Sequence, residues 1–400
     1  MLNFTRRLLL GGLSVLAGQV ALTHGAMAQD ANKKEITLGY SISLTGKFST
    51  DATDTHRAYQ LWAEQVNKAG GISVKGRKLP VKLTYYDDTS DTNTAIRNYE
   101  RLVTRDEVDL LLSPWGSGLN FAVTAANEKY KIPMVLSSAA SDQIFSRNLK
   151  YIFGSTQLAS NFYESLGDYL AANKEQVKTV AIAYENFLFT QSLHDFLLKK
   201  LASLGVKVVV DEQYPLGGQD FTSLLTKVKA ASPDAFIVID IMPSAVYMTR
   251  QMGEVGFRPK LYAVNIGPMF QKEFTDTLGK SAENVVENGF WHQDLPYKGA
   301  KQYYDEFIAK YNKTPSTDAA YAYISTTILQ AAIEKAGSLD REEITQALRG
   351  GKFDTVLGPY EFDDRGVNKD QLSFLVQVQN AKRTIVWPKN VAESPLKLPY

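Results

Sequence analysis

Cysteine is absent from all 400 residues of the chain. Its absence excludes a disulfide framework, a zinc site built on thiolates, a cysteine nucleophile and a lipid anchor on cysteine. The four histidines are scattered, and neither an H-E-x-x-H pair nor a G-x-S-x-G turn occurs. We therefore expect no enzyme, with no catalytic residue, no metal ion and no cofactor.

An excess of charge of one sign is also lacking. The chain has 44 basic and 43 acidic residues, which argues against nucleic acid or an anionic membrane as a partner. Hydrophobic residues make up 44% of the chain and charged residues 22%, as in folded globular proteins. A chain of this length is sufficient for two domains with cores of their own.

The first 28 residues have the pattern of a cleaved signal peptide. Arg6 and Arg7 precede an apolar run over 8–26, which ends in an A-x-A cleavage site at 26–28. The mature protein would then begin at Gln29 in the periplasm. The arginine pair leaves both Sec and twin-arginine export open. Because no later apolar run approaches the ~20 residues of a membrane span, we expect no stable membrane anchor.

Short apolar runs alternate with helical patterns along the remaining chain. This β-α-β-α order, with right-handed crossovers, predicts doubly wound parallel sheets. Because the pattern starts again after 151–153, we expect two such units. The expected strands are 36–41, 81–86, 110–112, 134–136, 179–184, 206–210, 235–239 and 261–264, and the expected helices are 55–69, 92–104, 191–204, 221–231, 244–255, 300–311, 318–335 and 341–348.

The predicted fold class is α/β, with two doubly wound parallel-sheet lobes joined by a three-strand hinge. Too few strands accompany the helices of the last quarter to form a third sheet, so these helices would cover an existing lobe. Three crossings of the chain would allow the lobes to close on each other. The predicted N-terminal lobe comprises 29–156 plus 290–355, the C-terminal lobe comprises 157–289 plus 356–400, and the crossings lie near 155–156, 288–289 and 357–359.

Two turns of small polar residues follow neighbouring predicted strands, in PWGSG and SSAASD. In an open α/β sheet, ligands bind beside the carboxyl ends of the strands at the topological switch point. Ser117 and Ser141 each open a helix there and offer hydroxyl and N–H groups to an anion, with Trp115 as an apolar wall. Each serine alone also fits a simple helix cap.

The order of the motifs resembles one known family. GYSISLTG, NKAGGI, GRKLPVKLTYYDDTSD, SPWGSG, PMVLSSAASD and DTVLGPYEFDDRG follow one another as in the leucine-binding-protein-like type I periplasmic binding proteins, the solute receptors of ABC importers. The resemblance covers essentially the whole mature chain. It implies a receptor that captures a small carboxylate-bearing solute, with an amino acid as the first expectation, and delivers it to a membrane permease. A receptor for aromatic or aliphatic acids without an amine, and a sensor that feeds a signalling receptor, remain open.

The resemblance also implies the ligand contacts. In the family, two switch-point turns of the N-terminal lobe hold the ligand carboxylate, and the other lobe adds an aromatic ring. Matched turn by turn, the contacts are the hydroxyls of Ser117 and Ser141, the backbone at Trp115, Ala139 and Ala140, and the ring of Phe189.

The sequence departs from the family at the site of the ligand ammonium. Amino-acid-specific members carry a carboxylate in the turn that here reads 264–267, where no acid occurs. Asp240, after the strand 235–239, is the nearest replacement by topology, although it also fits a cap of the helix at Ser244. An unpaired buried ammonium is costly, so without a replacement a plain carboxylic acid is the better ligand.

Overall fold

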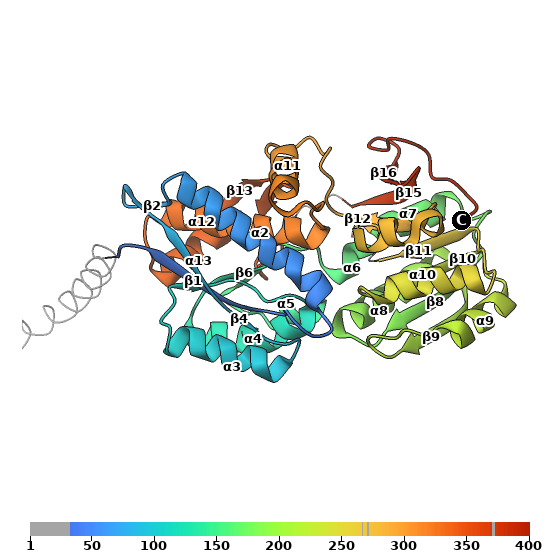
Figure 1. The fold of residues 1–400 in the computed structure, drawn as a ribbon, viewed down its shortest axis with the longest axis horizontal. Coiled ribbons are helices and arrows are strands. Elements are labelled where there is room, and N and C mark those ends of the chain that lie inside the picture. Colours follow the sequence, from blue (N-terminus) through green and yellow to red (C-terminus); the bar gives the residue numbers. More distant parts are fainter. Residues whose placement is uncertain (1–32, 266, 270–271, 370–372) are drawn as a thin grey trace, which may run out of the picture.

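Two α/β lobes lie side by side along the long axis of the molecule (Figure 1). The structure, a computed structural model, describes residues 33–265, 267–269, 272–369 and 373–400. The expected signal peptide at 1–28 lies outside the described residues. Within them, none of the helices has both the length and the apolar character that crossing a bilayer requires.

The first lobe is built on parallel strands. They form a three-stranded sheet in the order β4-β1-β5 and a separate pair, β6 and β7, and a bridge between Trp115 and Ser138 joins the segments that follow β5 and β6. The core strands are apolar runs buried on both faces, as parallel sheets require. The strands are β1 (Ile36–Ile42), β4 (Val81–Asp87), β5 (Leu110–Leu111), β6 (Met134–Leu136) and β7 (Ile152–Gly154), with a small hairpin of β2 (Ile72–Val74) and β3 (Arg77–Leu79).

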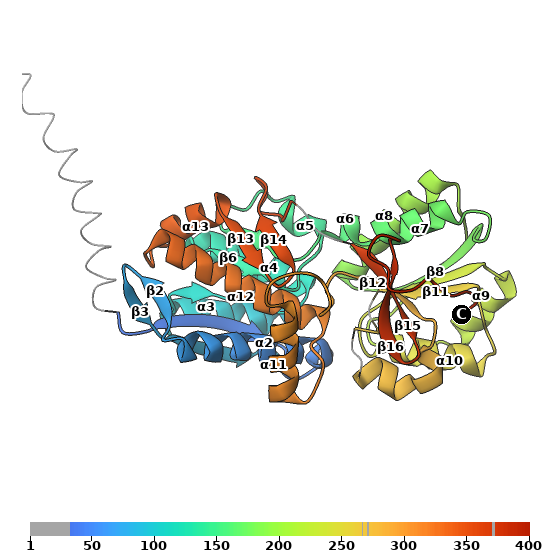
Figure 2. The same ribbon diagram turned by 90° about the horizontal axis from the view of Figure 1, so that it is seen from above.

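Helices from both ends of the chain cover this lobe (Figure 2). The longest of the late helices, α12 (Thr317–Ala336), packs against α2, α13 and β6 and is buried around most of its circumference, which explains its run of small and apolar residues. The other helices of the lobe are α2 (Ser49–Lys68), α3 (Thr92–Thr104), α4 (Ser117–Tyr130), α5 (Asp142–Phe145), α11 (Ala300–Tyr311) and α13 (Arg341–Arg349).

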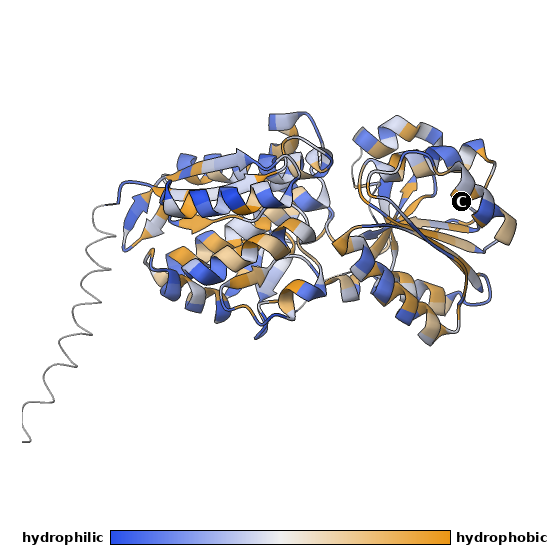
Figure 3. Ribbon diagram, turned by 90° about the horizontal axis from the view of Figure 1, so that it is seen from below, coloured by the Kyte–Doolittle hydropathy of each residue, from blue (hydrophilic) through white to orange (hydrophobic). Residues whose placement is uncertain are grey.

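The second lobe contains a seven-stranded sheet in the order β16-β15-β12-β11-β10-β8-β9. Its strands are mostly apolar, whereas the helices on it carry polar outer faces (Figure 3). Strand β15 runs antiparallel to its two neighbours, β12 and β16, which the sequence did not predict. The elements are α6 (Ala159–Phe162), α7 (Glu164–Ala172), β8 (Thr179–Glu185), α8 (Leu188–Leu204), β9 (Lys207–Tyr214), α9 (Thr222–Ala231), β10 (Ala235–Ile239), α10 (Ser244–Glu254), β11 (Leu261–Val264), η1 (Lys272–Asp276), η2 (Gly279–Ala282), β12 (Val286–Gly289), β15 (Phe374–Gln379) and β16 (Lys382–Trp387).

The third predicted crossing, at 357–359, is wrong. These residues belong to a hairpin of β13 (Lys352–Thr355) and β14 (Gly358–Glu361) that packs on the first lobe. The Tyr360 hydroxyl donates to the Ser155 carbonyl (2.9 Å), and the hairpin turn is closed by a hydrogen bond from the Thr355 hydroxyl to the Gly358 carbonyl (2.8 Å). The chain therefore returns to the second sheet later, at β15. The other lobe limits drawn from the sequence stay predictions.

Candidate ligand-binding site

A narrow cavity with a volume of about 50 Å³ lies between the two lobes. The first lobe lines it with Trp115, Gly116, Ser117, Ser138, Ala139, Ala140, Thr156, Thr317, Asp318 and Tyr321. The second lobe and the crossings line it with Phe162, Phe187, Phe189, Asn265, Met269, Asn288 and Phe290.

The N-terminus of α4 opens on this cavity. Its cap residue is Gly116, whose φ of 85° lies in the left-handed region that favours glycine, and no side chain caps the helix at this position. The first N–H groups of an α-helix have no acceptor within the helix, and the dipole makes this end positive. The first turn of α4, which begins at Ser117, is therefore suited to bind an anion.

Ser117 connects the two predicted turns. Its Oγ accepts hydrogen bonds from the backbone N–H groups of Ala140 (3.1 Å) and Ser141 (3.2 Å). These two N–H groups thus already have an acceptor in the protein, and the predicted ligand contact at the Ala140 backbone stays a prediction. Because the hydroxyl accepts both bonds and lines the cavity, its own proton is left to donate to a ligand.

Ser141 does not line the cavity. Its hydroxyl is 2.9 Å from the hydroxyl of Ser192, which lies on α8 of the second lobe, and both side chains are buried. Ser141 therefore contributes a contact between the lobes in this structure, and its predicted contact with a ligand stays a prediction.

One carboxylate that no sequence pattern singled out, that of Asp318, also lines the cavity. The indole Nε1 of Trp115 donates to its Oδ2 over 2.9 Å. Burial raises the pKa of Asp318 to about 6, and the hydrogen bond from Trp115 opposes this rise. Most of the Asp318 side chains are then ionised at neutral pH, so the cavity contains a negative group with oxygen capacity left for a cation.

The wall formed by the second lobe is largely aromatic. Phe187 stacks parallel to Trp115 of the first lobe, with ring centroids 6.4 Å apart and an interplanar angle of 3°. Phe189 reaches the cavity as predicted, and Phe162 packs between it and Phe290, with centroid distances of 5.4 and 4.3 Å. This wall offers an apolar surface to a side chain or a ring.

Two amide oxygens interrupt this apolar wall. Oδ1 of Asn265 and Oδ1 of Asn288 are buried and have no hydrogen-bond partner among the described residues. Asn265 occupies the turn in which the family places an acid, and its Nδ2 donates to the Asp240 carbonyl (3.1 Å). Buried acceptors of this kind are costly unless a donor reaches them. The cavity therefore presents acceptors from both lobes.

Asp240 itself is not part of the cavity wall. It is fully buried, and neither carboxylate oxygen has a partner among the described residues. Burial raises the pKa of Asp240 well above its usual range, and the nearby charges of Glu185 and Asp51 raise it further. Asn265 lines the cavity and Asp240 does not, so the role of Asp240 beside a ligand ammonium stays a prediction without support from the cavity wall.

Outside the ligand cavity, one histidine and two acidic residues lie close enough together to act as metal ligands. Ligand atoms of His292, Asp294 and Glu393 lie within 4.8 Å of one another, the only such group in the described part of the chain. The group borders a separate groove that Lys382 and Arg383 also line, and both of its acids are exposed. Two cations beside exposed acids do not favour a bound metal ion, so we assign none.

Comparisons with known proteins agree with this architecture. Residues 35–383 match the family model described as periplasmic binding protein. The leucine-, isoleucine-, valine-, threonine- and alanine-binding protein of Pseudomonas aeruginosa is 28% identical over 318 residues, which cover 78% of this chain and 82% of that protein.

Two solved structures share the fold. A branched-chain amino acid transporter substrate-binding protein of Streptococcus pneumoniae, in complex with isoleucine, is 24% identical with a TM-score of 0.79, covering 89% of this chain and all of that chain. A solute-binding protein of an ABC transporter from Rhodopseudomonas palustris, in complex with benzoate, is 17% identical with a TM-score of 0.78, covering 88% and 95%. The chain therefore belongs to the periplasmic binding protein family, as a substrate-binding protein of the ABC-transporter type with the type I fold and not an enzyme.

Proposed function

We propose that this protein captures an α-amino acid with an apolar side chain in the periplasm and presents it to the permease of an ABC importer. One observation carries the proposal. The positive N-terminus of α4 and the carboxylate of Asp318 line the same apolar cavity. A site with one group for an anion and one for a cation fits a zwitterion.

The α-carboxylate would bind at the N-terminus of α4. There it would accept hydrogen bonds from the first-turn N–H groups and from the Ser117 hydroxyl. A hydrogen bond to a charged group contributes about 1.5–3 kcal/mol. Two or three such bonds hold the carboxylate in its charged form without a buried cation, as the resemblance to the family implied.

The ammonium group would bind at Asp318. The Trp115 indole holds this carboxylate in place by a 2.9 Å hydrogen bond, and the Ser138 side chain also bonds to it. A carboxylate has about four lone-pair sites, so acceptor capacity remains for the ligand. The unpartnered oxygens of Asn265 and Asn288 supply further acceptors. A ligand without an amine would instead bring a second negative charge to Asp318, which is unfavourable while Asp318 is ionised.

The side chain of the ligand would lie against the aromatic wall. Phe189, Phe290 and Met269 provide an apolar surface without a fixed charge. The Pseudomonas relative is named for five amino acids with aliphatic or small side chains, and the Streptococcus structure holds isoleucine. Both names agree with a side-chain pocket of this character.

An aromatic acid without an amine is the second candidate. The parallel rings of Trp115 and Phe187 would suit a planar ligand, and the Rhodopseudomonas structure holds benzoate. This alternative requires Asp318 to be protonated, so that it donates to the ligand. The two candidate ligands thus require different protonation states of the Asp318 carboxyl group.

A screen of matched ligand pairs tests the proposal. Protein that has been unfolded and refolded, to remove any ligand carried through purification, is heated with each apolar amino acid and with its deaminated acid. A ligand at 100 times its Kd stabilises by about 2.7 kcal/mol, which a thermal shift detects. We expect the amino acid of at least one pair to raise the Tm and its deaminated partner not to do so. A response to the deaminated acids alone would reject the proposal in favour of the second candidate.

A further inference from the structure

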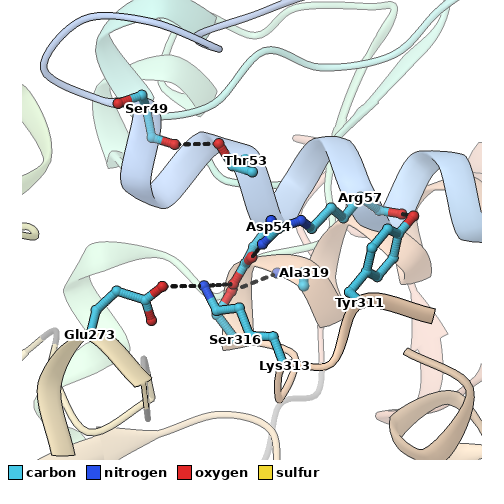
Figure 4. A network of polar contacts seen from close by, with 9 residues as sticks. All are labelled: Ser49, Thr53, Asp54, Arg57, Glu273, Tyr311, Lys313, Ser316 and Ala319. Atoms are coloured by element: carbon cyan, nitrogen blue, oxygen red, sulfur yellow. Dashed lines mark hydrogen bonds and ion pairs between the residues drawn. The ribbon is translucent and has the colours of Figure 1, made fainter. Parts of the chain in front are cut away.

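One buried cation connects the lobes outside the ligand cavity (Figure 4). Lys313, in the loop between α11 and α12, has a side chain that is only 7% exposed. Its Nζ lies 3.2 Å from Oδ2 of Asp54, which is on α2 of the same lobe, and 2.7 Å from Oε1 of Glu273, which is on η1 of the second lobe. An ion pair therefore spans the gap between the lobes at this point.

We propose that Lys313 and Glu273 form a latch that holds the lobes closed and thereby sets the affinity for the ligand without contacting it. The latch rests on the proposed function, since it assumes a ligand bound between the lobes. Neither residue is among those that line the cavity. The latch would change the ligand affinity by shifting the equilibrium between the open and closed forms of the protein.

The first-lobe half of the latch is preorganised. Asp54 is fully buried, and its second oxygen accepts a hydrogen bond from Arg57 (3.1 Å), so the carboxylate is fixed where it can hold Lys313. Because all three residues belong to the first lobe, opening would leave Lys313 in place. Glu273, 29% exposed with the pair formed, would then exchange water for a cation that Asp54 already orients. Such preorganisation reduces the entropy that closure costs.

The latch also connects the segments that carry the two walls of the cavity. Lys313 lies three residues before Ser316, whose hydroxyl accepts the N–H of Ala319 (3.2 Å) and caps α12 (Figure 4). The first turn of α12 carries Asp318 into the cavity. On the other side, Glu273 follows Met269, a residue of the second-lobe wall. Pairing Lys313 with Glu273 therefore fixes the Met269 segment against the start of α12.

Glu273→Gln is the sharpest variant, because it removes one charge and keeps the shape of the side chain. A ligand that needs the closed form binds with an apparent affinity proportional to the closed population. We expect the Kd for isoleucine, measured by calorimetry, to rise about tenfold, which corresponds to about 1.4 kcal/mol. Glu164→Gln is the matched control, since Glu164 pairs with Lys200 (2.5 Å) within the second lobe. It should leave the Kd unchanged.

Closure can be measured independently of the ligand. Because the chain has no cysteine, spin labels can be placed at Asn93→Cys on α3 and Ala230→Cys on α9, two exposed positions on different lobes. We expect Glu273→Gln to shift the distance distribution toward longer separations, with or without isoleucine, and the Glu164→Gln control to match the parent. A merely structural role of Glu273 would lower the Tm without ligand and leave the distance distribution unchanged.

The outcomes separate the latch from the ligand assignment. If isoleucine fails to bind but Glu273→Gln lengthens the distance, the latch holds and the proposed ligand is wrong. If isoleucine binds but Glu273→Gln changes neither the Kd nor the distance distribution, the latch is overturned while the proposed function stands. A distance distribution identical to that of the parent under both conditions also overturns it.

Discussion

The two walls of the cavity are built on different principles. The first-lobe wall carries fixed polar groups, with Ser117 joining two turns and Trp115 orienting Asp318. The second-lobe wall carries rings such as Phe189 and Phe290, interrupted by amide oxygens without partners. The difference indicates a division of labour. If the proposed function holds, the first lobe recognises the charged groups that all amino acids share, and the second lobe contacts the side chain of the ligand as the lobes close.

This division makes the two walls unequal in a thermodynamic sense. Contacts with the first lobe can form in the open protein and contribute to the first binding step. Contacts with the second lobe exist only after closure, so they determine how far a ligand shifts the open–closed balance. Substitutions in the first-lobe wall should therefore abolish binding of a whole class of ligands. Substitutions behind the second-lobe wall should leave the same class of ligands able to bind.

Asp318→Asn should have the largest effect. The variant keeps the shape of the side chain but removes the charge that, on the proposed function, pairs with the ammonium group, and a buried unpaired charge costs several kcal/mol. We expect affinity for amino acids to fall by about a hundredfold or more, as measured by calorimetry. Asp305→Asn, on the exposed face of α11 where Asp305 pairs with Lys301, is the control and should bind normally. An affinity of Asp318→Asn within threefold of the parent would show that Asp318 does not pair with the ligand ammonium group.

Ser117→Ala should have an intermediate effect on the same wall. It removes the acceptor of the Ala140 and Ser141 N–H groups together with the donor to the ligand carboxylate. We expect about a tenfold loss of affinity, or roughly 1.4 kcal/mol, for amino acids and plain acids alike. Ser146→Ala, whose exposed hydroxyl donates only to the Gln143 carbonyl among the described residues, serves as the control. Unchanged affinity would discard the placement of the carboxylate at α4.

Asp240→Asn should change the affinity least, by less than about twofold, because Asp240 does not line the cavity. Its effect should appear in stability. Burial raises the pKa of Asp240 in the folded protein, so the folded state binds the proton more tightly and loses stability as pH rises above the unfolded value of about 3.9. The asparagine variant lacks this penalty.

Urea unfolding of the parent and of Asp240→Asn at acid and at neutral pH measures the penalty. We expect the variant to gain stability relative to the parent as pH rises. An equal difference at both pH values would show that the Asp240 carboxyl does not titrate as its burial implies. A loss of amino-acid binding in the variant would restore Asp240 as a ligand contact.

Much of the fold could be predicted because buried parallel strands are continuous apolar runs. Strands β10 and β11 and helices α3 and α11 begin and end where the sequence pattern placed them. The hairpin β13–β14 and the antiparallel strands β15 and β16 carry no comparable signal, since their partners are set by tertiary contacts. The crossing between the lobes was therefore misplaced at 357–359, because the hairpin in which these residues lie was not predicted.

The site was predictable in part. The turn motifs and the resemblance to the family singled out Trp115, Ser117, Ala139, Ala140 and Phe189, which all line the cavity. Their contacts with a ligand stay predictions. Ser141 and Asp240 lie outside the wall because the direction of a side chain beyond a strand end depends on packing.

Asp318 was missed for a related reason. An acid in the first turn of a helix normally indicates favourable interaction with the helix dipole. Asp318 instead accepts a hydrogen bond from Trp115, which lies 203 positions away in the chain. No local pattern contains that information.

The pH dependence of binding tests the central claim most directly. Neither charged group of a free amino acid titrates between pH 5 and 7.5, whereas Asp318, with a pKa of about 6, does. Calorimetry with isoleucine and its deaminated acid should show isoleucine binding about tenfold more tightly at the higher pH, the acid binding less tightly there, and both trends lost in Asp318→Asn. Equal affinities for the two ligands, or an amino-acid affinity that is independent of pH, would contradict the account.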